Sequence, residues 1–117
     1  MEKIVFFDTE TTGLPIWSEP SDSEAQPHLT QIAALVVDAD TRKVLSSIDL
    51  TIRPEGWEIP AETVELNQLT TEHCANVGVN EMLAITMFLS LIAGAKNIIA
   101  HNSSFDQRII RIAMKRY

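Results

Sequence analysis

Apolar and polar positions along the chain follow two periods, one typical of strands and one typical of helices. Ile4–Phe7 is a short run of β-branched and aromatic residues, which predicts a buried central strand. Residues 30–38 and 44–52 predict two further strands, and the short turn between them makes the pair antiparallel. Residues 98–100 predict a fourth strand that is reached through a helix and therefore runs parallel to its neighbour. The pattern is that of an α/β fold.

Helical periodicity occupies the stretches between and after these strands. Residues 60–66 predict a short helix, and residues 70–75 predict another helical turn. A longer helix is predicted over 81–93, with Asn80 as its N-cap and Gly94 as its stop. Its apolar stripe predicts core packing by Met82, Ile85, Phe88, Leu89 and Ile92. The last helix starts at a cap on Ser103 or Ser104, with Phe105, Ile109 and Ile112 on one face.

Residues 15–28 contain three prolines and three serines, which predicts a long loop. Trp17 lies in this loop. A tryptophan in such a position either faces a substrate or anchors its own loop on the core, and we favour the anchoring role.

Composition limits the class of protein. A length of 117 residues suits one small domain, and 45% hydrophobic residues with a mean hydropathy of +0.05 suit a globular core. The single Cys74 leaves no internal disulfide and fits a reducing compartment. No secretory signal precedes the first strand, and the longest uncharged stretch is too short to span a membrane, so we expect a cytoplasmic protein without a membrane partner.

Charge is unevenly distributed. The formal net charge is −7, which argues weakly against tight nucleic-acid binding that is independent of sequence. Residues 96–117 nevertheless carry five basic residues and one acidic residue. Arg108, Arg111 and Lys115 lie along one side of the last predicted helix, and a solvated helix face is sufficient to explain them.

Asp8 and Glu10 follow the first apolar run and are two residues apart. Because side chains alternate along a strand, both point to the same side, at the strand's carboxyl end where open α/β sheets place their sites. Two adjacent carboxylates repel each other, and a hard divalent cation such as Mg²⁺ or Mn²⁺ relieves this repulsion. A strand end that emerges into solvent explains the pair equally well.

Asp106 is the only acid in the basic C-terminal segment. It falls in the first turn of the last helix, just after the fourth strand, so it can face Asp8 and Glu10. Three carboxylates that converge on one cleft can hold two divalent ions about 3.5–4 Å apart, an arrangement used for in-line phosphoryl displacement. The pattern therefore predicts a metal-dependent site for phosphate chemistry.

Two segments carry a resemblance to a known family. Phe7–Leu14 resembles the first motif of the DnaQ-like 3′→5′ exonucleases (the DEDD superfamily), and Ala100–Asp106 resembles their second motif. The resemblance covers the whole chain and is greatest to the phage and bacterial branch, which includes proteins like the epsilon subunit of DNA polymerase III. It implies a ribonuclease H-like α/β fold, with a mixed sheet of three antiparallel strands and one parallel strand flanked by helices.

The resemblance also implies a function. Such enzymes hydrolyse phosphodiester bonds at the 3′ end of single-stranded DNA or RNA with two Mg²⁺ or Mn²⁺ ions. Asp8, Glu10 and Asp106 match three of the four catalytic carboxylates that bind the metals. The implied partners are a nucleic acid with a free 3′ end and, in some relatives, a DNA polymerase subunit. The implied substrate-binding positions are Thr11, Thr12, Gly13, Leu14, His101, Asn102 and Phe105.

Two departures from the family pattern modify these expectations. Asn67-Gln68 stand before Leu69-Thr70, where the family often shows His-Gly. The third motif, a His or Tyr followed closely by Asp, supplies the fourth carboxylate and a general base, and it does not occur before Tyr117. We therefore expect residues 1–117 to be the N-terminal part of a single exonuclease-like domain, truncated or degenerate. Such a domain lacks C-terminal elements, cleaves weakly, and exposes apolar surface that promotes self-association.

Two other functions remain open at this point. A catalytically weak or inactive nuclease fold that binds nucleic acid or a partner is as compatible with the missing motif as an active enzyme. A haloacid-dehalogenase-like phosphatase also places an Asp-x-Asp after an apolar strand, but Glu10 replaces the second Asp and no later paired-Asp motif follows. The sequence does not choose between DNA and RNA, because no motif reads the 2′-hydroxyl.

Overall fold

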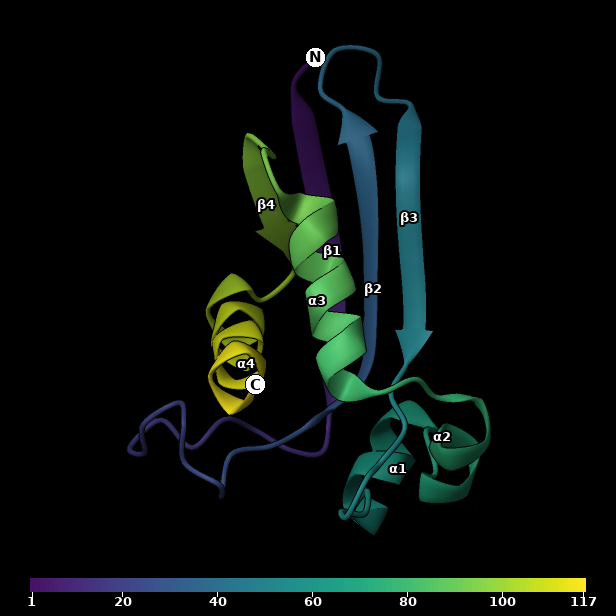
Figure 1. Cartoon of the computed structure of the whole chain (residues 1–117), viewed down its shortest axis with the longest axis vertical. Helices are drawn as coiled ribbons and strands as arrows, with labels where there is room; N and C mark the ends of the chain where they lie inside the picture. Colours follow the sequence, from purple (N-terminus) through teal and green to yellow (C-terminus); the bar gives the residue numbers. More distant parts are fainter.

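A four-stranded mixed sheet forms the centre of the computed structural model, which describes all of residues 1–117 (Figure 1). The strands are β1 (Lys3–Thr11), β2 (Leu29–Asp38), β3 (Val44–Thr51) and β4 (Asn97–Ala100), in the spatial order β3-β2-β1-β4. β2 is antiparallel to both β1 and β3, and β4 is parallel to β1. The mixed sheet predicted from the sequence is confirmed.

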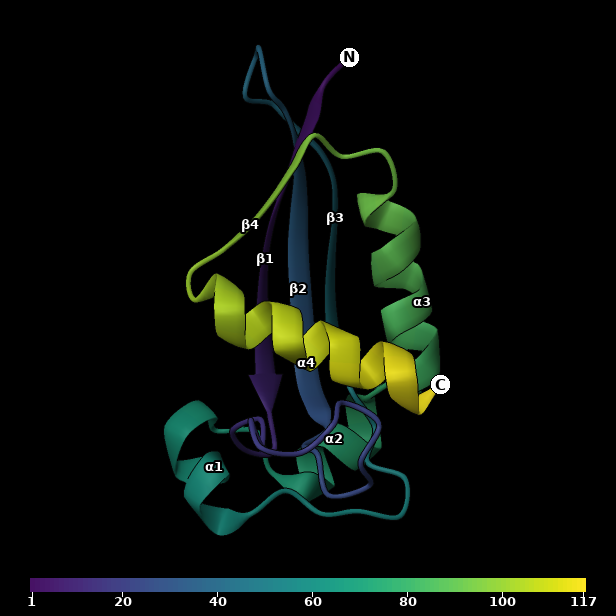
Figure 2. The same ribbon diagram turned by 90° about the vertical axis from the view of Figure 1, so that its left-hand side faces the viewer.

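Four helices complete the fold: α1 (Ala61–Asn67), α2 (Thr71–Val77), α3 (Glu81–Ile92) and α4 (Ser103–Arg116). α3 lies on one face of the sheet, α4 crosses the lower part of its β1–β4 edge and ends beside α3, and α1 and α2 lie beyond its lower end (Figures 1 and 2). Val5 and Phe7 of β1 are buried under these helices, and the Phe7 ring lies 5.2 Å from that of Phe88 on α3. None of the helices is long and apolar enough to cross a membrane.

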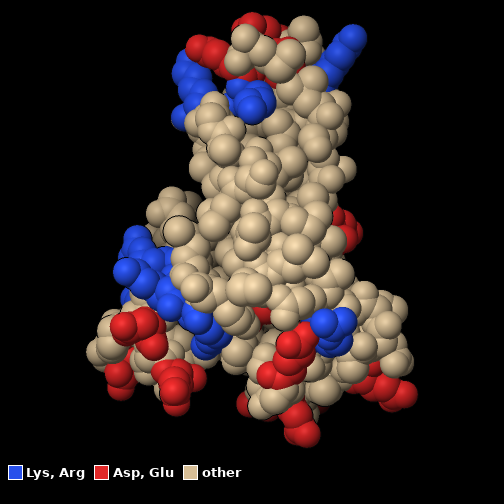
Figure 3. Space-filling view, in the orientation of Figure 1, with Lys and Arg blue, Asp and Glu red and all other residues tan.

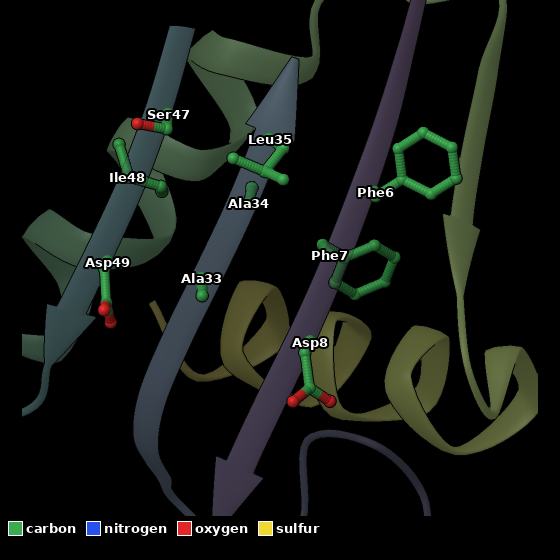
Figure 4. Close-up of a pocket in the computed structure, with 9 residues that line it drawn as sticks. All are labelled: Phe6, Phe7, Asp8, Ala33, Ala34, Leu35, Ser47, Ile48 and Asp49. Carbon is green, nitrogen blue, oxygen red and sulfur yellow. The ribbon is translucent and has the colours of Figure 1, made fainter. Parts of the chain in front are cut away.

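The opposite face of the sheet carries no helix, as the edge-on view in Figure 2 shows. Phe6, Leu35 and Ile99 are each more than two-fifths exposed there. Part of this face forms a depression of about 400 Å³ whose lining includes Asp8 and Asp49 (Figure 4). We call it the open face. Apolar side chains and a candidate catalytic acid therefore share one surface.

Four local predictions were wrong. β1 extends beyond the predicted apolar run Ile4–Phe7 to Thr11, and Asp8 and Glu10 lie in its carboxyl-terminal part, as predicted; the extent of the strand was underestimated. Met82 is exposed, because it lies on the side of α3 away from the sheet. The N-cap of α4 is Asn102, without a side-chain capping bond, instead of a serine. Trp17 is not buried against the core, since 58% of its surface is exposed.

Candidate active site

β1 distributes its polar residues over both faces of the sheet by simple alternation. Asp8 is exposed and Glu10 is half-buried, on the open face. Thr9 and Thr11 are buried on the face that α3 and α4 cover. The two candidate metal ligands of β1 therefore lie on the same side of the strand, with one residue between them that points the other way.

Asp106 occupies a different environment from the two acids of β1. It is 3% exposed in the first turn of α4, and its Oδ1 accepts a 2.6 Å hydrogen bond from the hydroxyl of Thr9. Burial raises the pKa of the Asp106 carboxyl, and the negative charge of Asp8 raises it further. The influence of Asp8 indicates that these two carboxylates belong to one electrostatic neighbourhood.

The three candidate ligands are all carboxylates, and carboxylate oxygens are the ligand type that a hard divalent cation prefers. Asp8 and Glu10 offer carboxylate oxygens at the surface, and the unfavourable effect of Asp8 on ionised Asp106 is the repulsion that a cation relieves. The structure does not gather three His, Cys, Asp or Glu side chains into one cluster with metal-binding geometry. One oxygen of Asp106 is engaged by the hydroxyl of Thr9.

A pocket of about 190 Å³ adjoins Glu10 at the end of β1. It lies between the loop after β1, helix α1 and the start of α4. Four of the seven predicted substrate-binding residues line it: Thr11, Gly13, Leu14 and Phe105. Residues from three parts of the sequence therefore form one small concave surface beside a candidate metal ligand.

Three predicted substrate-binding residues lie elsewhere. His101 and Asn102 are exposed in the turn before α4 and do not line the pocket. Thr12 is committed to holding the loop: its hydroxyl accepts from the His28 amide, and its carbonyl accepts from the hydroxyl of Thr63 on α1. Thr12 therefore fixes the position of the pocket wall instead of facing a ligand.

Asn67 is a site residue that the sequence did not identify. Its Oδ1 accepts a hydrogen bond from the Leu69 amide at 3.0 Å, and this leaves its Nδ2 directed at Glu10 Oε2, 3.5 Å away. Gln68 beside it has a φ of 65°, a left-handed conformation that glycine adopts most easily. At the position where the family often has His-Gly, this chain has an amide in place of the imidazole and a left-handed residue, Gln68, in place of glycine.

A second buried polar cluster lies away from the candidate site and also escaped sequence analysis. Glu81, at the start of α3, is 3% exposed and accepts hydrogen bonds from the Leu29 amide and the Tyr117 hydroxyl, each at 2.7 Å. His28 Nδ1 lies 2.8 Å from its Oε1, and the His28 ring stacks on Trp57. A single sequence carries no signal that links Glu81 to these hydrogen-bond partners, because Tyr117 and His28 lie 36 and 53 residues away from it in the chain.

Comparison with solved structures identifies the fold. The structure of E. coli exonuclease I in complex with a dT13 oligonucleotide superposes with a TM-score of 0.79 at 21% identity, over 99% of this chain and 24% of its own. The ExoI/SSB-Ct complex gives 0.79 at 21% identity, over 100% and 25% of the two chains. A moderately thermophilic exonuclease I from Methylocaldum szegediense gives 0.75 at 18% identity, over 93% and 22%. These similarities confirm the ribonuclease H-like fold.

The chain spans about a quarter of the length of these solved proteins. No curated protein sequence matches it significantly. The sequence profile of the RNase T family, described as exonuclease, matches residues 5–117, which is nearly the whole chain. The chain therefore belongs to the RNase T exonuclease family, as the two motifs at Phe7–Leu14 and Ala100–Asp106 predicted.

Proposed function

We propose that this chain carries the catalytic acids and the terminal-nucleotide pocket of a 3′→5′ exonuclease that degrades single-stranded DNA. The observation that carries the proposal is the pocket of about 190 Å³, which brings Leu14 and Phe105 beside Glu10. Solved exonuclease I holds single-stranded oligonucleotides, and this supports the choice of substrate.

Asp8, Glu10 and Asp106 are the residues that would hold Mg²⁺ or Mn²⁺. When bound, two such ions supply an activated water and stabilise the leaving oxygen of a phosphodiester. The protein's own part is positioning: Asn67 steadies Glu10, and Thr9 holds Asp106. Leu14 and Phe105 offer apolar surface for a terminal base, and stacking of this kind tolerates any sequence.

A second candidate function is a nuclease fold that binds single-stranded nucleic acid and cleaves it weakly or not at all. Two observations favour it: no three His, Cys, Asp or Glu side chains form a cluster with metal-binding geometry, and Asp106 is buried with one oxygen bonded to the Thr9 hydroxyl. The phosphatase alternative loses support, because the chain belongs to an exonuclease family and the second motif has no role in a phosphatase.

Digestion of a 5′-labelled single strand tests the proposal. With Mg²⁺ we expect a ladder that shortens from the 3′ end, slow digestion when the 3′ hydroxyl is blocked by phosphate, and little effect of a 5′ block. Asp8→Asn should lower the rate at least about 100-fold, because it removes a metal ligand. The matched control is Asp49→Asn, which removes a carboxylate from the same open face and should leave the rate unchanged.

Two results would contradict the proposal. Efficient cutting of a covalently closed circular strand would show that no free end is required. Tight binding of the labelled strand without any shortening, in Mg²⁺ or Mn²⁺, would favour the second candidate function.

A further inference from the structure

We propose that the solvent face of α4, together with Trp17, binds the single strand that leads away from the terminal-nucleotide pocket. This inference rests on the proposed function and adds a second contact zone to it. We call the zone the α4 basic face and define it as Arg108, Arg111, Lys115 and Trp17. Its partner is a single-stranded DNA backbone with bases free to stack.

Arg111 and Lys115 lie on the side of α4 that faces away from the core, and Arg108 lies half-buried at the edge of that side. Residues on the opposite side of the helix, such as Ile109 and Ala113, are buried, while Arg111 and Lys115 are exposed. Spacings of three and four residues place Arg108, Arg111 and Lys115 in one row along the helix. None of the three forms a salt bridge, whereas Arg53, Lys96 and Arg116 each pair with a carboxylate. The exposed charges of Arg111 and Lys115 are therefore available to a phosphate backbone, while Arg108 holds the Trp17 loop.

Trp17 extends this row onto the neighbouring loop. The Arg108 guanidinium lies 5.4 Å from the centre of the Trp17 ring, and its Nη2 donates a 2.6 Å hydrogen bond to the Glu19 carbonyl. Arg108 Nε is buried and has no hydrogen-bond partner. The Arg108 cation thus holds the Trp17 indole in place, and the ring remains 58% exposed. A fixed, exposed aromatic ring is a surface on which a nucleic-acid base can stack.

The α4 basic face continues directly from the pocket. Phe105 lines the pocket and lies one helical turn before Arg108; Leu14 lines it as well and lies three residues before Trp17. At 1.5 Å per residue, Phe105 and Lys115 are about 15 Å apart along α4, the length of about four stacked nucleotides. Figure 2 shows α4 running across the molecule with the loop that carries Trp17 alongside it.

The distribution of charge over the molecule favours a polyanion at the α4 basic face. The net charge is −7, but residues 96–117 carry five basic residues against Asp106. In Figure 3 the basic atoms at the lower left form one patch, bordered below by acidic groups. A second basic group lies at the far end of the sheet, at the turn that contains Arg42 and Lys43, and provides a matched control.

Fluorescence anisotropy with 5′-labelled dT8 and dT2, without divalent metal to prevent cleavage, tests the inference. The double variant Arg111→Gln/Lys115→Gln should weaken dT8 binding at least about tenfold at low salt and leave dT2 binding unchanged. It should also reduce the slope of log K against log salt by about 0.7 for each phosphate that the variant no longer neutralises. Arg42→Gln/Lys43→Gln changes the net charge equally and should leave dT8 binding as it is.

Trp17→Ala should weaken dT8 binding about tenfold, and Trp17→Phe should restore most of it, because stacking needs an aromatic ring.

Two results would overturn the inference. One is equal dT8 affinity of the wild type and Arg111→Gln/Lys115→Gln, and the other is competition by poly-Glu that is as strong as competition by unlabelled dT8. Circular dichroism of each variant shows whether it is folded. A failure of the proposed function would give a different result. The wild type would still bind dT8 through the α4 basic face, but it would not shorten the strand from its 3′ end in the presence of Mg²⁺.

Discussion

At the scale of single residues, the contact between Thr9 and Asp106 joins two elements at the candidate site. Thr9 points away from the open face, and its hydroxyl is the donor that satisfies a nearly buried carboxylate 97 residues further on. Alternation along β1 explains why the acids on either side of Thr9 face solvent. The same alternation places the hydroxyl of Thr9, between two candidate catalytic acids, against the third, Asp106.

Thr9→Val should destabilise the fold by about 1–3 kcal/mol, because valine keeps the shape of threonine and leaves the buried Asp106 oxygen without its donor. Urea unfolding followed by circular dichroism measures the loss. Thr9→Ser keeps the hydroxyl and should retain most of the stability. Equal stability of the valine variant and the wild type would show that this hydrogen bond contributes nothing in solution.

At the scale of elements, Glu81 ties together the start of α3, the start of β2 and the last residue of the chain. Burial by itself favours the protonated carboxyl, but hydrogen bonds from His28, Tyr117 and the Leu29 amide outweigh burial and lower the pKa of Glu81. Burial, together with the same contact with Glu81, raises the pKa of the Tyr117 hydroxyl far above its usual range. The ionised form of Glu81 is therefore the form that stabilises the fold.

A lowered carboxyl pKa contributes stability that is complete above the ordinary glutamate value of about 4.3 and is lost as the pH falls through the lowered value. Glu81→Gln should therefore cost about 1.5–3 kcal/mol at pH 7, with the difference from the wild type shrinking below about pH 4. Urea titrations at several pH values measure it. Glu65→Gln, at an exposed position on α1, is the control. A difference that stays constant down to pH 3 would mean that the charge of Glu81 is not what stabilises this junction.

The elements themselves could be predicted because periodicity and turn residues act locally. β2, β3, β4 and all four helices lie within a few residues of the predicted ranges. The pair Asp8 and Glu10 could be read from alternation, and Asp106 from its place after an apolar strand. The partners of Glu81 and the Asn67–Glu10 contact could not be predicted, since they join residues far apart in the sequence. Trp17 was misjudged because a cation on α4, rather than the core, holds its ring.

At the scale of the whole molecule, the sheet is covered on one face and bare on the other (Figure 2). The bare, open face carries Phe6 and Leu35 near Asp8, with Ile99 opposite Phe6 on β4. Contiguous apolar surface of this kind is typical of an interaction site. We therefore expect the predicted self-association of residues 1–117 to occur through the apolar side chains of the open face.

Phe6→Thr should reduce self-association and keep the fold, because the side chain is 43% exposed and threonine suits a strand. Sedimentation velocity over a range of protein concentrations measures the change. Val77→Thr removes an exposed apolar side chain from α2, away from the sheet, and should have no effect. A Phe6→Thr variant that associates as strongly as the wild type would place the contact elsewhere.

Binding of Mn²⁺ tests the central claim, that Asp8, Glu10 and Asp106 form one divalent-metal site, more directly than any assay of cleavage. Calorimetric titration of the wild type, Asp8→Asn and Asp49→Asn with MnCl₂ requires neither substrate nor turnover. We expect Asp8→Asn to lower Mn²⁺ affinity at least about tenfold with an unchanged circular dichroism spectrum, and Asp49→Asn to bind Mn²⁺ as the wild type does. Equal affinity of Asp8→Asn and the wild type would contradict the account, because the ion would then be held without the residue on which the site is built.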